Sequence, residues 1–535
     1  MKLTLDGLKN KSEWKSAGIE IPGYDVGKIR ENTIAAPKWV HFGVGNIFRI
    51  FIGGIQDKLI GSGAADTGII CAETFDYEII DRIYKPYDNL VLAVTLKADG
   101  TTEKKVVGSL AEAVPADRKD EDSWNRLVEI FKDGGLQMLS FTITEKGYAL
   151  RGSDGGYLPY VKPDIENGPD RPVCAMAVVT SLLYERFKNG AAPLAVVSMD
   201  NCSHNGEKLK NSVLTVANEW KNAGYVPQEF VDYISDESIV SFPWTMIDKI
   251  TPRPSTDIAN QLEKSGVEDM QPVITAKNTY IAPFVNAEGP QYLVVEDNFP
   301  NGRPALEKGG VYMTDRNTVN EVERMKVTTC LNPLHTALAV YGCMLGYTSI
   351  AAEMKDEELV KLVNGIGPDE GMKVVCDPGI LSPDDFVREV IEERLTNVFI
   401  PDTPQRIACD TSQKVGIRYG ETVKSYVKKY GTAESLRYIP LAIAGWLRYL
   451  LAVDDDGNAF ELSPDPMLGE LRESLDGVKL GEPESVGDKL RGILSNESIF
   501  GCNLYDAGIG EKIEALFAEE IAGKGAVRAA LKKHV

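Results

Sequence analysis

Residues 38–46 read Lys-Trp-Val-His-Phe-Gly-Val-Gly-Asn, and this stretch decides the fold class. The apolar residues over 38–42 predict a β-strand, and the glycines that follow predict a tight turn that opens a helix over 47–59. A second apolar run, over 68–72, follows one helix later and ends on Glu73. Strands that alternate with helices at this interval are typical of α/β proteins with a parallel, doubly wound sheet.

This alternation continues to about residue 312 and then changes. Further apolar runs favour strands over 90–96, 137–143, 192–198 and 291–295, and amphipathic patterns favour helices over 123–131 and 178–187. From residue 318 most segments have helical apolar spacing, as in Leu334, Leu338, Tyr341 and Leu345, and further helices are predicted over 436–453 and 510–533. We therefore predict an N-terminal extension over 1–36, a Rossmann-like dinucleotide-binding domain over 37–312 and a mostly α-helical substrate-binding and catalytic domain over 313–535.

The charge balance limits the class of partner. The 535 residues include 79 Asp and Glu against 58 Lys and Arg, a formal net charge of −21. Nucleic acids and anionic membranes require a basic surface, so neither is an expected partner. An anionic substrate would need a local cluster of Lys and Arg side chains. No apolar run approaches the roughly 20 residues of a membrane span, and the first residues lack the apolar segment of a secretion signal. We expect a cytoplasmic protein, a monomer or small homo-oligomer, that acts on a small molecule.

The cysteines and histidines argue against a disulfide framework and a metal centre. The eight cysteines occur singly, with no C-x-x-C pair, which is typical of reduced thiols. The four histidines, at positions 41, 204, 335 and 534, have no spacing typical of metal ligands. The sequence therefore predicts no metal cofactor.

Two features of the first domain are candidates for binding a dinucleotide. The turn Gly43-Val-Gly45-Asn46 lies where a glycine backbone can approach a pyrophosphate at a helix N-terminus. Residue 48 is Phe, so the third glycine of the usual fingerprint is absent, and a plain tight turn is an equal alternative. Glu73 could accept hydrogen bonds from an adenosine ribose and would repel a 2′-phosphate, which favours NAD over NADP. The alternative for Glu73 is a solvated carboxylate at a strand end.

Two further runs contain candidates for substrate chemistry. Asn201 follows a predicted strand and could donate its amide to a substrate oxygen, or could simply cap a turn. Glu323 and Lys326 share one face of a predicted helix. Asn332, followed by proline, is predicted as the N-cap of the next helix, with His335 in its first turn. A buried Lys326 with a lowered pKa could act as a general acid or base, whereas an exposed one would only pair with Glu323.

A series of motifs resembles those of the polyol-specific long-chain dehydrogenase/reductase family, the mannitol dehydrogenase group. The family patterns G-x-G-x-F-H-R, T-I-T-E-x-G-Y, S-C-D-N-L-P-x-N-G and F-P-x-T-M-V-D-R-I-T-P correspond to residues 43–49, 142–148, 198–206 and 242–252. Residues 47 and 48 are Ile-Phe where Phe-His is usual, residues 202 and 203 are Cys-Ser where Leu-Pro is usual, and Lys249 replaces Arg. The pattern K-x-x-x-x-N-x-x-H is matched by Lys326, Asn332 and His335, and R-I-A-x-D-x-S-x-K by residues 406–414. One departure is that Lys326 and Asn332 are six residues apart where the family usually has five, so a bulge or a helix break must absorb one residue.

The resemblance implies a metal-independent, NAD-dependent oxidoreductase. The residues that it implies for cofactor binding are Gly43, Gly45, Asn46, Ile47, Glu73 and Thr144. It implies that Lys326 is the general base in alcohol oxidation and the general acid in ketone reduction. The residues that would hold the reacting oxygen or a neighbouring hydroxyl are Asn201, Asn332 and His335. Those that would bind the rest of the substrate or tune the lysine are Asp248, Lys249, Arg406, Glu145 and Glu323.

The expected substrate is D-fructuronate, reduced by NADH to D-mannonate. Arg406 is the predicted anchor of the substrate carboxylate, because arginine can grip a carboxylate through two parallel hydrogen bonds. Mannitol with fructose, and tagaturonate, are the alternative substrates. An alternative of another class is a non-catalytic NAD-binding sensor on the same fold. The lysine beside Glu323 and Asn332 favours the enzyme, because a sensor would have no use for it.

Overall fold

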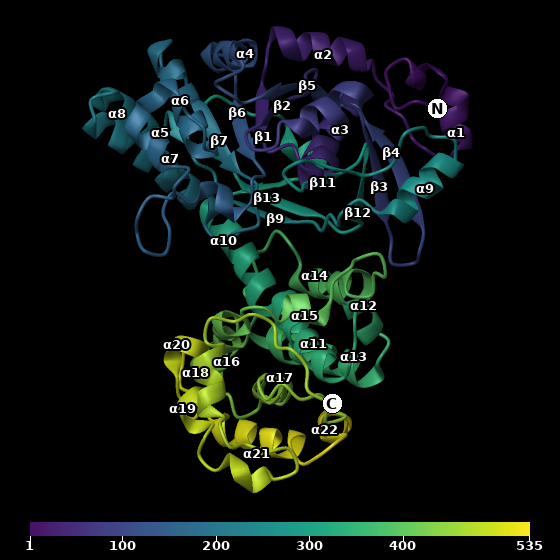
Figure 1. Cartoon of the computed structure of the whole chain (residues 1–535), viewed down its shortest axis with the longest axis vertical. Coiled ribbons are helices and arrows are strands. Elements are labelled where there is room, and N and C mark those ends of the chain that lie inside the picture. Colours follow the sequence, from purple (N-terminus) through teal and green to yellow (C-terminus); the bar gives the residue numbers. More distant parts are fainter. The chain divides into compact units, whose positions relative to one another are not determined.

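The structure is a computed structural model that describes residues 1–535. The chain divides into two compact units: unit 1 comprises residues 1–97 and 101–320, and unit 2 comprises residues 98–100 and 321–535. In Figure 1, unit 1 is coloured from purple to teal and unit 2 from green to yellow. None of the helices has the length and apolar character that a membrane span requires.

A six-stranded parallel sheet forms the centre of unit 1. The strand order is β5-β2-β1-β6-β7-β8, with bounds Leu110–Pro115, Ile69–Glu73, Trp39–Phe42, Met138–Phe141, Leu194–Ser198 and Val240–Ser241. His41 of β1 is in register with Cys71 of β2 and with Ser140 of β6. The order of the strands reverses between β1 and β6, which is the topological switch point where doubly wound folds bind their ligands. The predicted doubly wound fold is confirmed, and the glycine turn follows β1 at this switch point.

Both faces of this sheet are buried. Along β1, Val40 and Phe42 belong to one apolar core and Trp39 to the other, as expected for side chains that alternate across a strand. Helices α4, α6, α7 and α8 contribute to the first core and α3 to the second (Figure 1). The helices of unit 1 are α1 (Lys11–Ser16), α2 (Val26–Ala35), α3 (Gly53–Gly61), α4 (Glu121–Lys132), α5 (Lys162–Asn167), α6 (Ala175–Lys188), α7 (Asn205–Asn222), α8 (Gln228–Ser235) and α9 (Thr256–Lys264).

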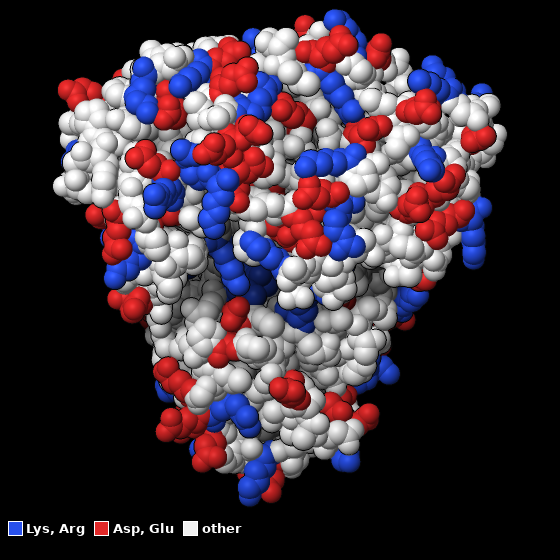
Figure 2. Space-filling model, turned by 45° about the horizontal axis from the view of Figure 1, so that its top comes forward, with Lys and Arg blue, Asp and Glu red and all other residues white.

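Three smaller sheets complete unit 1. Their strands, in spatial order, are β12 (Phe284–Glu288), β3 (Val91–Leu96) and β4 (Thr102–Val107); β14 (Tyr312–Thr314), β13 (Tyr292–Glu296) and β9 (Thr245–Asp248); and β10 (Val273–Ile274) with β11 (Tyr280–Ile281). On the face shown in Figure 2, acidic and basic side chains are intermixed over unit 1. An anion therefore depends on local cations rather than on a broad basic surface.

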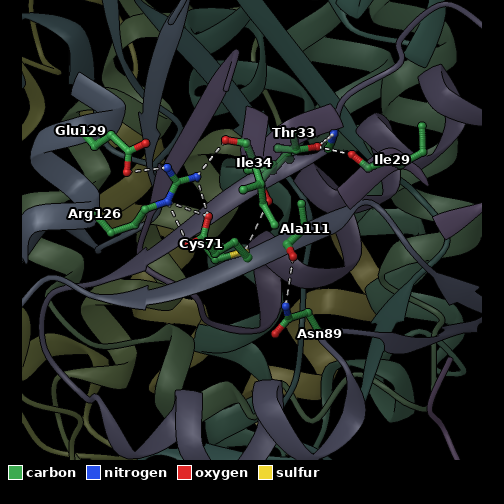
Figure 3. Close-up of polar contacts among 11 residues, drawn as sticks. Ile29, Thr33, Ile34, Cys71, Asn89, Ala111, Arg126 and Glu129 are labelled. Carbon is green, nitrogen blue, oxygen red and sulfur yellow. Dashed lines mark hydrogen bonds and ion pairs between the residues drawn. The ribbon is translucent and has the colours of Figure 1, made fainter. Parts of the chain in front are cut away.

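The predicted N-terminal extension is an ordered part of unit 1. Trp14 is fully buried, and α2 is attached to the sheet by polar contacts shown in Figure 3. The hydroxyl of Thr33 accepts the Gly68 amide at 2.7 Å, and Arg126 of α4 donates to the Ile34 carbonyl at 3.2 Å. The same guanidinium forms ion pairs with Glu112 and Glu129. Residues 1–36 therefore stabilise the edge of the dinucleotide-binding fold.

Unit 2 consists of helices and their connecting loops. Helix α10 (Arg316–Met325) crosses the division between residues 320 and 321, a few residues after the predicted boundary. The helices that follow are α11 (Asn332–Met344), α12 (Ile350–Glu353), α13 (Glu357–Asn364), α14 (Pro383–Glu389), α15 (Pro404–Ile407), α16 (Glu421–Tyr430), α17 (Tyr438–Tyr449), α18 (Leu468–Ser474), α19 (Arg491–Leu494), α20 (Glu497–Phe500), α21 (Gly510–Glu520) and α22 (Ala526–His534). The helix predicted over 510–533 is thus two helices. Gly523 and Gly525, both with positive φ, lie in the break.

Four π-helical turns interrupt the helices of unit 2. They are η8 (Lys326–Cys330), η9 (Gly365–Glu370), η11 (Val390–Arg394) and η13 (Gly416–Gly420). A π turn contains one residue more than an α turn, costs some packing and is found frequently at functional sites. Two of these turns, η8 and η13, position residues of the candidate site.

Candidate active site

The turn after β1 can accommodate a dinucleotide. Gly43 has φ +92°, and a Cβ at this position would lie 2.3 Å from the carbonyl oxygen of Thr142, so only glycine fits. At Gly45 no atom lies within 4 Å of the place of a Cβ, so the backbone there is open to a ligand. The side-chain oxygen of Asn46 is buried without a hydrogen-bond partner, and Ile47 packs partly buried against the core. Open glycine backbone at a helix start suits a pyrophosphate.

Glu73 holds this turn from the end of β2. Its carboxylate accepts the Val44 amide at 3.0 Å and the Phe75 and Asp76 amides at 2.7 and 3.2 Å. Burial raises the pKa of Glu73, and these hydrogen bonds oppose the rise. Glu73 is 5% exposed, so the alternative of a solvated carboxylate is wrong. Its contact with a ribose stays a prediction.

Asp200 joins the ends of β6 and β7. Its carboxylate accepts the amides of Ile143 and Thr144, each at 2.9 Å, and the hydroxyl of Tyr148 at 2.6 Å. Thr144 has φ +64°, a strained conformation for a β-branched residue, which these hydrogen bonds help to maintain. Sequence reasoning missed Asp200, although it stands directly before Asn201 in the motif over 198–206.

The remaining candidates of unit 1 lie on nearby loops and on β9. Thr144, Glu145 and Asn201 are exposed at the strand ends, and Glu145 forms an ion pair with Lys208 of α7. The side chain of Asn205 binds the carbonyl of Asp200 at 3.0 Å and both the amide and the hydroxyl of Thr245 on β9, so it fastens the two segments together. The residues that end β9 and follow it are Asp248, which is buried, and Lys249, which donates to the carbonyl of Glu288 at 2.5 Å.

In unit 2, Lys326 is the first residue of the π turn η8. It is 3% exposed, so the alternative of an exposed lysine paired with Glu323 is wrong. Glu323 lies half-buried on α10. The carbonyl oxygen of Lys326 accepts the amide of Leu331, five residues on, at 3.1 Å. This π turn absorbs the additional residue between Lys326 and Asn332, because it contains one residue more than an α turn.

Asn332 and His335 lie in the first turn of α11. The N-cap is Leu331, one residue before the predicted Asn332, and Asn332 makes no capping hydrogen bond. Its amide therefore remains available to a ligand. The backbone amide of His335 donates to the Leu331 carbonyl at 3.1 Å, which places the imidazole in the first turn, as predicted.

Burial, one carboxylate and three guanidinium groups act on the pKa of His335. Burial lowers its pKa to about 4; Asp402 opposes this shift, and Arg418, Arg406 and Arg394 add to it. The imidazole Nε2 is buried without a hydrogen-bond partner and lies 3.5 Å from Asp402 Oδ2. His335 is therefore neutral near pH 7, with a ring nitrogen able to bond a hydroxyl.

Arg406, the predicted carboxylate anchor, is engaged by Asp402. The two form an ion pair four residues apart in the chain, with Asp402 just before α15, and the Arg406 side chain is 61% exposed. Asp402 accordingly contacts both His335 and Arg406. Sequence reasoning missed Asp402, and the signal that could have revealed it is its i, i+4 spacing to Arg406.

Arg418 in η13 is the third residue that sequence reasoning missed. Its guanidinium donates to the hydroxyl of Thr336, and the adjacent Tyr419 hydroxyl donates to the Pro333 carbonyl at 3.0 Å. These two bonds hold η13 against the first turn of α11. Lys414 is a neighbouring cation, and burial and Arg418 lower its pKa.

The chain matches two family models. Residues 37–308 match the mannitol dehydrogenase Rossmann domain, and residues 318–519 match the mannitol dehydrogenase C-terminal domain. The chain therefore belongs to the mannitol dehydrogenase family of oxidoreductases, and the predicted family is confirmed.

Individual relatives extend this result. The chain is 52% identical to the D-mannonate oxidoreductase of Thermotoga maritima over 538 aligned positions, which cover 100% of this chain and 99% of the relative. The structure of a D-sorbitol dehydrogenase in substrate-free form has a TM-score of 0.79 at 25% identity, covering 96% of this chain and 98% of that one. The mannitol 2-dehydrogenase of Pseudomonas fluorescens, in a ternary complex with NAD and D-mannitol, has a TM-score of 0.69 at 25% identity and covers 100% and 99%.

Proposed function

We propose that this protein is a cytoplasmic enzyme that reduces D-fructuronate to D-mannonate with NADH and catalyses the reverse oxidation. The observation that carries the proposal is the 52% identity, over the whole chain, to the D-mannonate oxidoreductase of Thermotoga maritima. The three guanidinium groups that act on His335 support it, because a uronate is an anion and the chain has a net charge of −21. The eight free cysteines fit a reducing compartment.

The glycine turn supports NAD as the cofactor. Gly43, Gly45, Asn46 and Ile47 would hold the pyrophosphate, and Thr144 would contact the cofactor from the end of β6. Glu73 would bind the adenosine ribose and disfavour a 2′-phosphate. The similar mannitol 2-dehydrogenase structure contains NAD. When bound, NADH supplies the hydride for the keto carbon of the substrate.

Lys326 is the proposed general acid of the reduction. It donates a proton to the keto oxygen as this oxygen gains negative charge, and it accepts the proton again in the oxidation. Asn332 and Asn201 are the proposed amide donors that stabilise the developing negative charge, a contribution of about 3 kcal/mol for one well-placed donor. Neutral His335 binds a neighbouring hydroxyl.

The remaining candidates act on the rest of the substrate or on the lysine. Asp248 and Lys249 would bind the hydroxyls and Arg406 would position the chain. Glu145 and Glu323 are the proposed carboxylates that relay the proton or tune Lys326. Acid–base catalysis of this kind is typically worth 10²–10⁴-fold in rate.

An assay of NADH oxidation with several substrates tests the proposal. D-fructuronate should give the highest kcat/KM, above tagaturonate and fructose, and D-mannonate should be oxidised in reverse. Mannitol with fructose is the second candidate, favoured by the similarity to mannitol 2-dehydrogenase, but at 25% identity only. A higher kcat/KM for fructose or tagaturonate would overturn the proposed substrate. NADH binding without turnover of any of these sugars would favour the non-catalytic sensor.

A further inference from the structure

Arg418 is a half-buried arginine that forms no ion pair. Its guanidinium makes one hydrogen bond, to the hydroxyl of Thr336, whereas a guanidinium has five N–H donors. A charge that is partly removed from water without a counterion destabilises a protein, and folded chains usually pair such charges. The remaining donors of Arg418 therefore point to a ligand as their partner.

Other enclosed arginines of this chain show the contrast. Arg186 donates to five backbone carbonyls, and Arg448 donates to three. Both have almost no exposed surface, so they act as structural cross-links. Arg49 makes no hydrogen bond, but it is 0% exposed and lies over the ring of Tyr84, so no solute can reach it. Arg418 differs from all three because it is accessible and its donors are unused.

The surroundings of Arg418 are suited to an anion. Thr336, which binds it, directly follows His335, so the guanidinium lies at the first turn of α11. That turn adds the positive end of a helix dipole. Lys414 is a second cation beside Arg418, and Asp402, the carboxylate close to His335, is already paired with Arg406. Asp410 and Asp465 act on Lys414, but no carboxylate of the chain forms an ion pair with Arg418.

We propose that Arg418 binds the carboxylate of the sugar-acid substrate and determines the preference for uronates over neutral ketoses. The inference rests on the proposed function and makes it more specific. Arginine suits this role because its planar guanidinium can form two parallel hydrogen bonds with a carboxylate, which lysine cannot. Arg406, held by Asp402 at the surface, then has a positioning role in place of the anchoring role predicted from the sequence.

The test compares Arg418→Met with Arg418→Lys in the full-length enzyme at saturating NADH. Arg418→Met should raise the KM for D-fructuronate by roughly 10- to 100-fold, the usual worth of a charge-assisted pair, with a much smaller change in kcat. The KM for fructose should stay within about twofold, because a neutral ketose has no carboxylate to lose. Arg418→Lys should give an intermediate KM for fructuronate, since the charge remains but the two-bond geometry is lost.

A matched control is Arg388→Met. Arg388 is exposed on α14 and paired with Asp385, so its removal should leave both KM values unchanged. The thermal unfolding midpoint of each variant shows whether the substitution destabilises the fold. A merely structural Arg418 would in addition change the kinetic constants for fructose and fructuronate alike. Arg418→Lys keeps the test decisive if Arg418→Met fails to fold.

The outcomes separate this inference from the proposed function. If the wild-type enzyme prefers fructuronate and Arg418→Met leaves its KM within about twofold, this inference alone is wrong. An equal loss for fructose and fructuronate also overturns it. If the wild-type enzyme prefers tagaturonate, the proposed substrate fails, but a selective rise in the KM for tagaturonate still supports a carboxylate site at Arg418. A preference for fructose in the wild-type enzyme overturns both.

Discussion

Nε2 of His335 lies 3.5 Å from Oδ2 of Asp402, and the other Asp402 oxygen binds Arg406. Asp402 thus stands between a buried imidazole and a surface guanidinium. The carboxylate favours a charged imidazole, but burial and three arginines oppose it, and the pKa of His335 falls to about 4. Asp402 therefore faces a neutral ring, makes no hydrogen bond to its Nε2 and forms no true ion pair with it.

The first prediction is that His335 remains neutral throughout the physiological pH range. Its imidazole resonances, assigned by comparison with His335→Gln, should show no titration midpoint above about pH 5 in an NMR titration. The unfolded chain binds this proton near the ordinary histidine pKa of about 6.5, and the folded chain only near 4. The contribution to stability is therefore complete above about pH 6.5 and lost as the pH falls towards 4. A midpoint near 6.5 in the folded enzyme would contradict this picture.

The second prediction concerns Asp402→Asn. The substitution keeps the size of the side chain but removes the charge that holds Arg406 and faces His335. Both groups should lose their fixed positions, and kcat/KM should fall by roughly tenfold or more for every substrate, because small misplacements in a site are costly. Steady-state kinetics with fructuronate and fructose provide the measurement. A fall in kcat/KM for fructuronate alone would show instead that Asp402 acts through the substrate carboxylate.

The sequence predicted the fold well because the evidence for it is local. The apolar run at 38–42, the glycines after it and Glu73 all lie within one strand-helix-strand unit, so their spacing predicts the parallel sheet. The helix break between 521 and 525 was missed, although Gly523 and Gly525 were visible in the sequence. The helical spacing of apolar residues is compatible across α21 and α22, so spacing alone predicted a single helix.

The site was predicted in part, and two of the three missed residues, Asp402 and Arg418, share one property. Motif spacing identified Lys326 and His335, and the structure buries the lysine as the acid-base hypothesis requires. Asp402 and Arg418 meet His335 and Thr336 only through tertiary packing, across more than sixty residues of chain, and no local pattern encodes that contact. The π turn at 326–330 was foreseen only as an unspecified bulge or helix break.

The third prediction is that Lys326→Ala lowers kcat by about 10²–10⁴-fold, the usual worth of a general acid or base. NADH binding, measured by fluorescence titration, should be retained because the lysine is not part of the glycine turn. Added primary amines should restore part of the rate by entering the space that the side chain leaves. More than a tenth of wild-type activity in the variant would contradict the assignment.

The fourth prediction uses Glu353 of α12, which is fully buried with no partner for either oxygen. Burial, with a smaller contribution from Asp356, raises its pKa to about 9. The unfolded chain releases this proton near 4.5 and the folded chain near 9, so stability falls as the pH rises between these values. Glu353→Gln, which cannot ionise, should raise the unfolding temperature more at about pH 8 than at about pH 5. An equal rise in the unfolding temperature at both pH values would show that Glu353 is not protonated in the folded protein.

The last prediction separates two roles of Glu73. Its carboxylate accepts three backbone amides, from Val44, Phe75 and Asp76, and so braces the glycine turn. Its charge is also predicted to disfavour the 2′-phosphate of NADPH. Glu73→Gln removes the charge and keeps one acceptor oxygen, so it should narrow the preference for NADH over NADPH. Its NH2 group replaces an oxygen that accepts a backbone amide, so it should also lower the unfolding temperature. Glu73→Ala removes the whole brace and should lower the unfolding temperature further. KM values for both cofactors, measured for both variants, provide the test, and an unchanged ratio in Glu73→Gln would confine Glu73 to the structural role.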